Sequence, residues 1–203
     1  MKTVVGLFRD TYDADQAINA LRDAGFSNAD FSVLAQEMVL DRDNISETYT
    51  DRTGDVGPAE GAGVGAAGGA VVGGLTGLLM GIGALAIPGI GPAIAVGSLA
   101  TALTSAAAGA TVGAVTGAVT GGVVAALVDM GIPEEDAHFY AEGVKRGGVL
   151  VTVSADDTRA ATAEAIMRNS DAVEVDVHRE NWRSQGWNDR FDETATPSSY
   201  SRF

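Results

Sequence analysis

Residues 61–81 read GAGVGAAGGAVVGGLTGLLMG, and this stretch decides the expected architecture of the chain. It opens a run, ending at residue 128, in which no side chain carries a charge. The run is interrupted by AIPGIGP at residues 86–92, where prolines and glycines prevent a helix from continuing undisturbed. We therefore predict a glycine- and alanine-rich helical hairpin, with a turn formed by Pro88, Gly89, Gly91 and Pro92.

The two helices of this hairpin are expected near residues 61–86 and 93–128, with the break at 87–92. At 1.5 Å per residue the second helix would be ~54 Å long, which is more than the hydrocarbon core of a bilayer requires. A second break is therefore predicted near 101–108, leaving a short helix followed by one near 107–128.

Glycine recurs in the hairpin at intervals of four residues, a pattern called a glycine zipper. Each glycine costs ~1 kcal/mol relative to alanine in a helix interior, so the pattern needs a compensating gain. Close approach of helix backbones supplies it through dispersion and Cα–H···O contacts. The second stripe extends backwards through Ser105, Thr101 and Gly97 to Ala93. We assign helix packing and oligomerisation to Gly61, Gly65, Gly69, Gly73, Gly77, Gly81, Gly97, Gly109, Gly113, Gly117 and Gly121.

The geometry of the stripe predicts more than one neighbour for the first helix. Four residues turn a helix by ~400°, so the stripe drifts by ~40° per step and by ~200° over six glycines. One straight partner helix cannot cover such a stripe. We therefore expect a homo-oligomer, in which hairpins of other copies supply the additional contacts.

The segments on either side of the hairpin each predict a strand–helix–strand unit. Residues 1–36 give a strand, a helix that ends at Gly25 and a second strand. Residues 149–178 repeat the pattern, with a last strand at Val173, Val175 and Val177. Together they predict an α+β fold, a ferredoxin-like βαβ–βαβ antiparallel sheet with helices on one face, interrupted by the hairpin.

Neither half has enough strands to fold alone, so the halves must combine across the insertion. The hairpin should then leave and return on the same side of the domain. The expected organisation is a first half at 1–36, a polar linker at 37–60, the hairpin at 61–128, a second half at 129–180 that opens with an amphipathic helix at 131–147, and a disordered tail at 181–203.

Composition restricts the partners and the compartment. The net charge of −14 argues against nucleic acid as a partner, because neutralising phosphates requires Lys and Arg. The absence of cysteine excludes disulfides and thiol chemistry. The first apolar stretch is too short for a signal peptide, so a cytoplasmic or cytoplasmic-membrane location is expected.

The sequence is compatible with either lipid or protein around the hairpin. Segments of ~20–25 residues are long enough to span a bilayer, and two crossings would return the chain to the same side. Against insertion, the flanks are acidic, for example at Asp55 and Asp129, where cytoplasmic loops usually carry Lys and Arg. Aromatic belts are absent from the sequence as well. The partners expected are other copies of the chain, with a lipid bilayer as the alternative.

No catalytic, cofactor-binding or metal-binding residue is predicted. Glu135 and His138 match the Glu-x-x-His spacing of di-metal helical bundles, with Glu142 one turn further on. Further ligands are not evident, and an acidic, solvated helix start is the simpler interpretation. Asp156 or Asp157 is expected to cap a helix, and the tail tryptophans are expected to be solvated or to bind a partner. The chain is not expected to be an enzyme.

Three segments resemble a bacterial family described as general stress or low-temperature-induced proteins with a YflT-like domain. They are VVGLFRDTYDADQAINALRDAGF, GGLTGLLMGIGALAIPGIGPAIAVG and MGIPEEDAHFYAEGVKRGGVLVTV. The resemblance covers roughly residues 1–178. It implies a role in stress adaptation, and it carries over no catalytic residue, cofactor or ligand.

The expected function is that of a non-enzymatic stress-related protein that self-assembles through its glycine-zipper hairpin and associates with the membrane. One alternative is a soluble homo-oligomeric assembly or shell protein with a buried helical layer. A second alternative is a ligand-sensing regulatory module built on the sheet.

Overall fold

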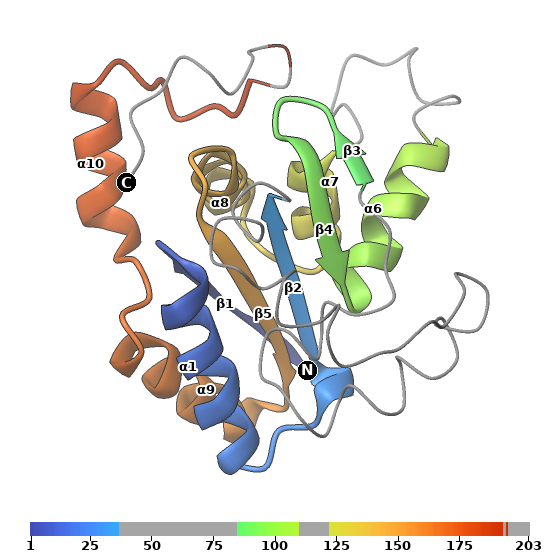
Figure 1. Cartoon of the computed structure of the whole chain (residues 1–203), viewed down its shortest axis with the longest axis vertical. Coiled ribbons are helices and arrows are strands. Elements are labelled where there is room, and N and C mark those ends of the chain that lie inside the picture. The colour runs from blue at the N-terminus through green and yellow to red at the C-terminus, as the bar shows by residue number, and fades with distance from the viewer. Residues whose placement is uncertain (37–84, 110–121, 193, 195–203) are drawn as a thin grey trace, which may run out of the picture.

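The computed structural model describes residues 1–36, 85–109, 122–192 and 194 (Figure 1). The predicted polar linker, most of the first zipper helix and the end of the tail lie outside these residues. The structure therefore addresses the α/β halves, the hairpin turn and part of the predicted second zipper helix.

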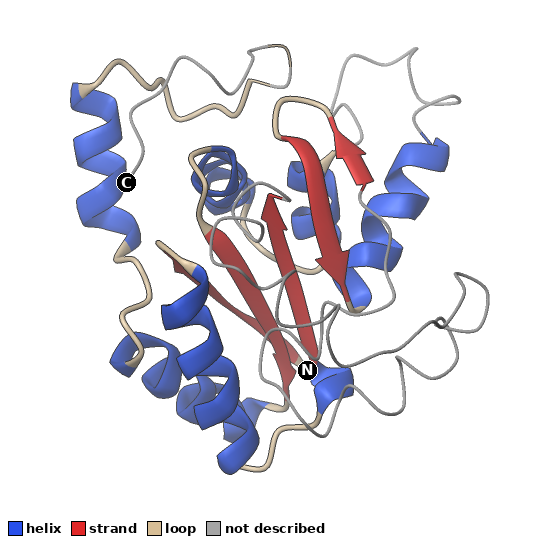
Figure 2. Cartoon of the chain, in the orientation of Figure 1, coloured by secondary structure: helices blue, strands red, loops and turns tan. Residues whose placement is uncertain are grey.

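The described residues form an α+β domain, as predicted (Figure 2). In chain order its elements are β1 (Lys2–Phe8), α1 (Thr11–Asp23), η1 (Asn28–Asp30), β2 (Phe31–Gln36), β3 (Leu85–Ile87), β4 (Gly91–Val96), α6 (Ser98–Gly109), α7 (Val123–Asp129), α8 (Glu134–Lys145), β5 (Val149–Ala155), α9 (Asp157–Asn169) and α10 (Val175–Ser184).

The five strands form one sheet in the order β1-β5-β2-β4-β3, and all neighbours are antiparallel. The strand β5 lies between β1 and β2, so the two halves of the chain do combine across the insertion. Val4 is opposite Val153 on one side of β5, and Phe31 is opposite Val153 on the other. The repeated βαβ–βαβ order is not found, because among the described residues no strand follows α9, and β3 and β4 extend the sheet instead.

Helices cover both faces of this sheet, so the prediction of helices on one face is wrong (Figure 1). Val149, Val151 and Val153 of β5 pack in one core with α1 and α9. Leu150 belongs to the other core, with residues of α6, α7 and α8. Thr152, between the valines, is also buried. A strand buried on both faces is rich in apolar residues at successive positions, and this is the pattern of VLVTV.

The AIPGIGP segment forms a turn, but it joins two strands rather than two helices. The amide of Ile90 donates to the carbonyl of Ile87 at 3.1 Å, which closes a four-residue turn. Pro88 and Gly89 occupy its second and third positions, and Gly89 has a φ of 77°. This is the residue pattern of a type II turn. The turn leads from β3 into β4.

The prediction of a helix from residue 93 is therefore wrong for 93–96, which form β4. The expected break near 101–108 is wrong as well, because α6 continues through these residues. Leu99 and Leu103 of α6 are buried, so packing on the sheet stabilises this helix.

The elements of the two halves agree with the sequence except at the C-terminus. Asp10 caps α1 by accepting a hydrogen bond from the amide of Asp13. Gly25 follows α1 with a φ of 84°, the left-handed conformation expected of a helix-terminating glycine. Asp156 caps α9, as predicted.

The predicted last strand at Val173, Val175 and Val177 is wrong. The amide of Val173 makes one hydrogen bond to the carbonyl of Leu7 in β1, at 2.7 Å, and the chain then enters α10. Val175 packs against the core and Trp182, seven residues later, is 2% exposed, whereas Val177 is 59% exposed. A spacing of seven places two residues on one helix face, so helical amphipathicity overrides the valine alternation.

The predicted disorder of the tail is wrong for residues 181–192. Trp182, Trp187 and Phe191 are all buried in the core that contains α8. Within the described ranges, no helix combines the length and the apolar character needed to cross a membrane.

Candidate functional site

Most of the predicted zipper glycines lie outside the described residues: Gly61, Gly65, Gly69, Gly73, Gly77, Gly81, Gly113, Gly117 and Gly121. Gly109 is the last residue of α6. Gly97 is not in a helix, contrary to the prediction. It lies between β4 and α6 with a φ of 79°, and a Cβ there would overlap the carbonyl oxygen of Phe31. Gly97 thus allows close approach to the backbone of β2 rather than to a second helix.

The Glu-x-x-His spacing on α8 does not assemble a metal site. Nδ1 of His138 accepts a hydrogen bond from the amide of Phe191 at 3.1 Å, and its Nε2 lies 3.7 Å from a carboxylate oxygen of Glu134. Glu135 is exposed, and Glu142 is buried in an ion pair. Among the described residues, no three His, Cys, Asp or Glu side chains are grouped to hold a metal ion.

The structure reveals a different candidate site, where the C-terminal segment 175–192 packs against α8. We call this contact the clasp. The rings of Phe139 on α8 and Trp182 on α10 stack with their centroids 4.6 Å apart. The Trp187 ring meets Trp182 edge-on at 5.7 Å. Such ring pairs contribute about 0.5–1.5 kcal/mol beyond the area they bury.

A reversal of the chain after α10 brings the second half of the clasp back to α8. Gly186 has a φ of 95°, and the amide of Trp187 donates to the carbonyl of Trp182 at 2.9 Å. This is a glycine-terminated helix end, in which backbone amides satisfy the last carbonyls. The following residues then run along α8 as far as Phe191, whose amide is bound by His138.

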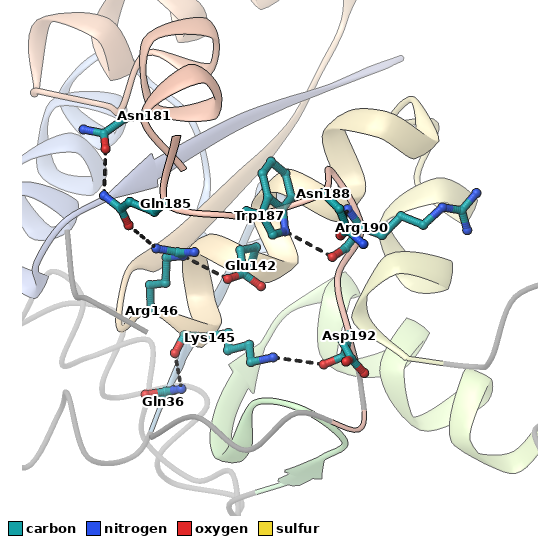
Figure 3. A network of polar contacts seen from close by, with 10 residues as sticks. All are labelled: Gln36, Glu142, Lys145, Arg146, Asn181, Gln185, Trp187, Asn188, Arg190 and Asp192. Atoms are coloured by element: carbon teal, nitrogen blue, oxygen red, sulfur yellow. Dashed lines mark hydrogen bonds and ion pairs between the residues drawn. The ribbon is translucent and has the colours of Figure 1, made fainter. Parts of the chain in front are cut away.

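Two ionic side chains are buried beneath the clasp, one in the last turn of α8 and one directly after the helix. Nε of Arg146 donates to a carboxylate oxygen of Glu142 at 2.9 Å, and these side chains are 1% and 2% exposed. Nη1 of Arg146 also donates to the side-chain oxygen of Gln185 at 3.1 Å (Figure 3). The guanidinium lies 4.7 Å from the ring centroid of Trp182, a cation–π contact.

Lys145 connects the clasp to the sheet. Its ammonium group donates to the backbone carbonyl of Asp192 at 3.0 Å and lies 5.3 Å from the ring centroid of Phe191. Its own carbonyl accepts a hydrogen bond from the side chain of Gln36 at 3.1 Å (Figure 3). The same side chain also donates to the carbonyl of Ile90 at 3.1 Å. Gln36 thus links the end of β2, the β3–β4 turn and the end of α8.

The polar contacts of the clasp hold segment 175–192 against α8. The buried charges are matched by partners of the opposite sign or by carbonyl groups, as buried charges require. Burial, with a smaller contribution from the charge of Asp136, raises the pKa of the nearby Tyr140 hydroxyl to about 12. Tyr140 therefore stays neutral at physiological pH.

Sequence reasoning missed the clasp, although part of its signal was present. Glu142 and Arg146 are spaced by four residues, the spacing of ion pairs on one helix face. Trp182, Trp187 and Phe191 are large apolar residues in a polar tail, and large apolar residues are more often buried than solvated. The sequence did not indicate which element they cover.

No protein-family model, curated protein or solved structure matches this chain.

Proposed function

We propose that this chain is a non-enzymatic, stress-related protein that self-associates through the glycine-rich part of its uncharged run. The supporting observation is that the described parts of that run belong to the folded domain. Residues 85–109 and 122–128 belong to the domain, where Ile90, Leu99 and Leu127 are buried. The core explains why these parts lack charge. The segments 61–84 and 110–121 keep their zipper spacing without such an explanation. The stress role rests on the resemblance described above.

The position of the insertion in the sheet supports an element that leaves and returns at one place. Gln36, the last residue of β2, is opposite Ala93 of β4, and Leu85, the first residue of β3, is opposite Ala93 on the other side. Two strand spacings separate Gln36 from Leu85, about 10 Å. Both ends of the insertion are thus held at one place in the sheet, and identical chains associate mostly with closed symmetry.

The lengths of the two segments favour protein over lipid as the surroundings. Residues 110–121 would extend only about 18 Å as a helix, whereas a bilayer core is about 30 Å thick. The first part of α6 cannot lengthen this segment, because Leu99 and Leu103 hold it in the core. A single crossing by 61–84 would separate β2 from β3, which the continuous sheet forbids.

Leucine at two zipper positions tests the proposal. Gly69→Leu with Gly73→Leu would block close helix approach, and Val71→Leu with Val72→Leu is the control that leaves the stripe intact. We expect light scattering after gel filtration to show an oligomer for the wild type and the control, and loss of that oligomer in the glycine variant. Circular dichroism should show that the domain remains folded. Survival of the wild-type oligomer in the glycine variant would exclude the zipper as its interface.

Membrane association remains the second candidate, because residues 61–84 are uncharged and long enough for one bilayer leaflet or more. Carbonate washing of membranes from expressing cells separates the two candidates. Retention in the washed membranes would support association with lipid, and full recovery in the soluble fraction would exclude insertion.

A further inference from the structure

The strand β1 forms one edge of the sheet, and its outer side is open along part of its length. Its neighbour in the sheet is β5, from Lys2 opposite Ala155 to Phe8 opposite Val149. The carbonyl of Leu7 points away from β5, since it accepts a hydrogen bond from the amide of Val173. Backbone groups in an antiparallel strand alternate sides, so those of Thr3 and Val5 also point outward.

In the described part of the chain, no backbone hydrogen bond reaches the outward groups of Thr3 and Val5. The hydroxyl of Thr3 donates to the carbonyl of Met130 at 2.8 Å, so this contact uses the side chain of Thr3 and not its outward backbone groups. Val173 therefore makes the first rung of a ladder on this edge, and α10 begins before a second rung can form.

The β1 edge has little of the protection that keeps edge strands from pairing. Such protection comes from prolines, bulges, charged side chains, very short strands or a covering helix or loop. The sequence KTVVGLF has seven residues in the strand, one charge at its start and no proline. The opposite edge is protected, because β3 has three residues and is followed directly by Pro88. An exposed edge of this kind is a template for adding a strand.

We infer that the open part of β1 pairs with β1 of a second copy of this chain, antiparallel across a two-fold axis, so that the two sheets join. In the register that fits, Thr3 is opposite Val5 of the second copy and each such pair exchanges two backbone hydrogen bonds. Val4 meets its counterpart at the axis. Lys2, the charged residue of the strand, is opposite Gly6 and meets no like charge.

A register shifted by two residues, with Val5 at the axis, would place Leu7 opposite Thr3. The carbonyl of Leu7 is already bound by Val173, so this register loses hydrogen bonds at both ends. The strand is thus complementary to itself in one register, which favours a second copy over an unrelated peptide. This interface is separate from the glycine zipper and does not depend on the proposed function.

Val5→Pro tests the interface, because it removes an amide that points outward and makes no bond to β5. Proline is tolerated in an edge strand at such a position. Val5→Thr is the matched control, since it keeps the amide and a β-branched side chain. Both substitutions are made in the full chain carrying Gly69→Leu and Gly73→Leu, so that association through the zipper does not contribute to the measured mass.

Light scattering over a dilution series should give a dimer mass for the parent and for Val5→Thr, and a twofold lower mass for Val5→Pro, with circular dichroism showing that the domain remains folded. A parent that is monomeric up to millimolar concentration, or a Val5→Pro variant that keeps the dimer mass, would overturn the inference. Failure of the zipper proposal is seen separately, as an unchanged mass when the two leucines are introduced into the wild type.

Hydrogen exchange gives a second measurement that needs no proline. The amides of Thr3 and Val5 should be protected at high protein concentration and should exchange at least tenfold faster on dilution below the dissociation constant. The amide of Val4 points toward β5 and should stay protected throughout. Exchange of Thr3 and Val5 that does not change with concentration would also overturn the inference.

Discussion

Removing one partner of the buried Glu142–Arg146 pair should destabilise the protein strongly. The two groups are 2.9 Å apart and are 2% and 1% exposed, so neither can be rehydrated in the folded state. Breaking such a pair typically costs 3–5 kcal/mol, because the remaining charge is buried without its counterion. We expect this cost for Glu142→Met, which leaves the guanidinium in place. Arg146→Met should cost at least as much, since it also removes the contacts with Gln185 and Trp182.

The double variant separates the charge effect from packing. Two methionines fill a similar volume without charge, so Glu142→Met with Arg146→Met should cost less than the sum of the single changes by about 3 kcal/mol or more. Urea unfolding followed by circular dichroism measures this. With a slope of about 2 kcal/mol per M, each single change should lower the midpoint by about 1.5–2.5 M. Single changes below 1 kcal/mol, or strictly additive costs, would refute the assignment of a desolvated ion pair.

Three further predictions concern other parts of the domain. Gly97→Ala should cost about 3 kcal/mol or more of folding free energy, because the added Cβ would overlap the Phe31 carbonyl. Gly91→Ala should cost only about 1–2 kcal/mol, because Gly91 has open space around it and the cost comes from its φ of 95°. Thermal unfolding compares the two variants, and equal costs would contradict the close approach at Gly97. Trp187→Ala should cost about 3–5 kcal/mol in urea unfolding, since this ring is buried, and a cost near zero would mean that the segment is solvated. Tyr140 should ionise at a pH of about 12, seen as a late phenolate absorbance that is missing in Tyr140→Phe. Its raised pKa means that the unfolded chain loses this proton first, so about 3 kcal/mol of stability should be lost as the pH rises from about 10 to about 12, and an unchanged late phase in Tyr140→Phe would contradict the assignment.

The sequence predicts the elements whose signals are local. Ala14, Ala17, Ile18 and Leu21 follow helical spacing, and all are buried on one face of α1. The alternating valines at 149, 151 and 153 predict β5, and the pairing of β5 with β1 and β2 follows from the need to combine two incomplete halves. Short-range periodicity and strand number thus predict these elements and the combination of the two halves in one sheet, but not the order of its strands.

The sequence does not predict the features that depend on tertiary packing. The valines at 173, 175 and 177 alternate as in a strand. The helix α10 forms instead, because it allows Trp182 to stack on Phe139. The clasp likewise depends on which helix receives the tail. A polar segment with a few aromatic residues does not indicate the element against which it packs, and disorder is then the default expectation.

The incorrect helix over residues 93–96 has a cause that matters for the rest of the zipper. A spacing of four is a multiple of two, so small residues at positions 93 and 97 are equally compatible with one face of a strand. The larger residues decide between the two, and Ile94 and Val96 are two apart, as in a strand. In the first zipper segment the large residues Val71, Leu75, Leu78 and Ile82 are spaced by four, three and four. A strand would put Leu75 and Leu78 on opposite faces, whereas a helix puts all four on one face. The prediction of a helix therefore has a second basis in that segment, which residues 93–97 lacked.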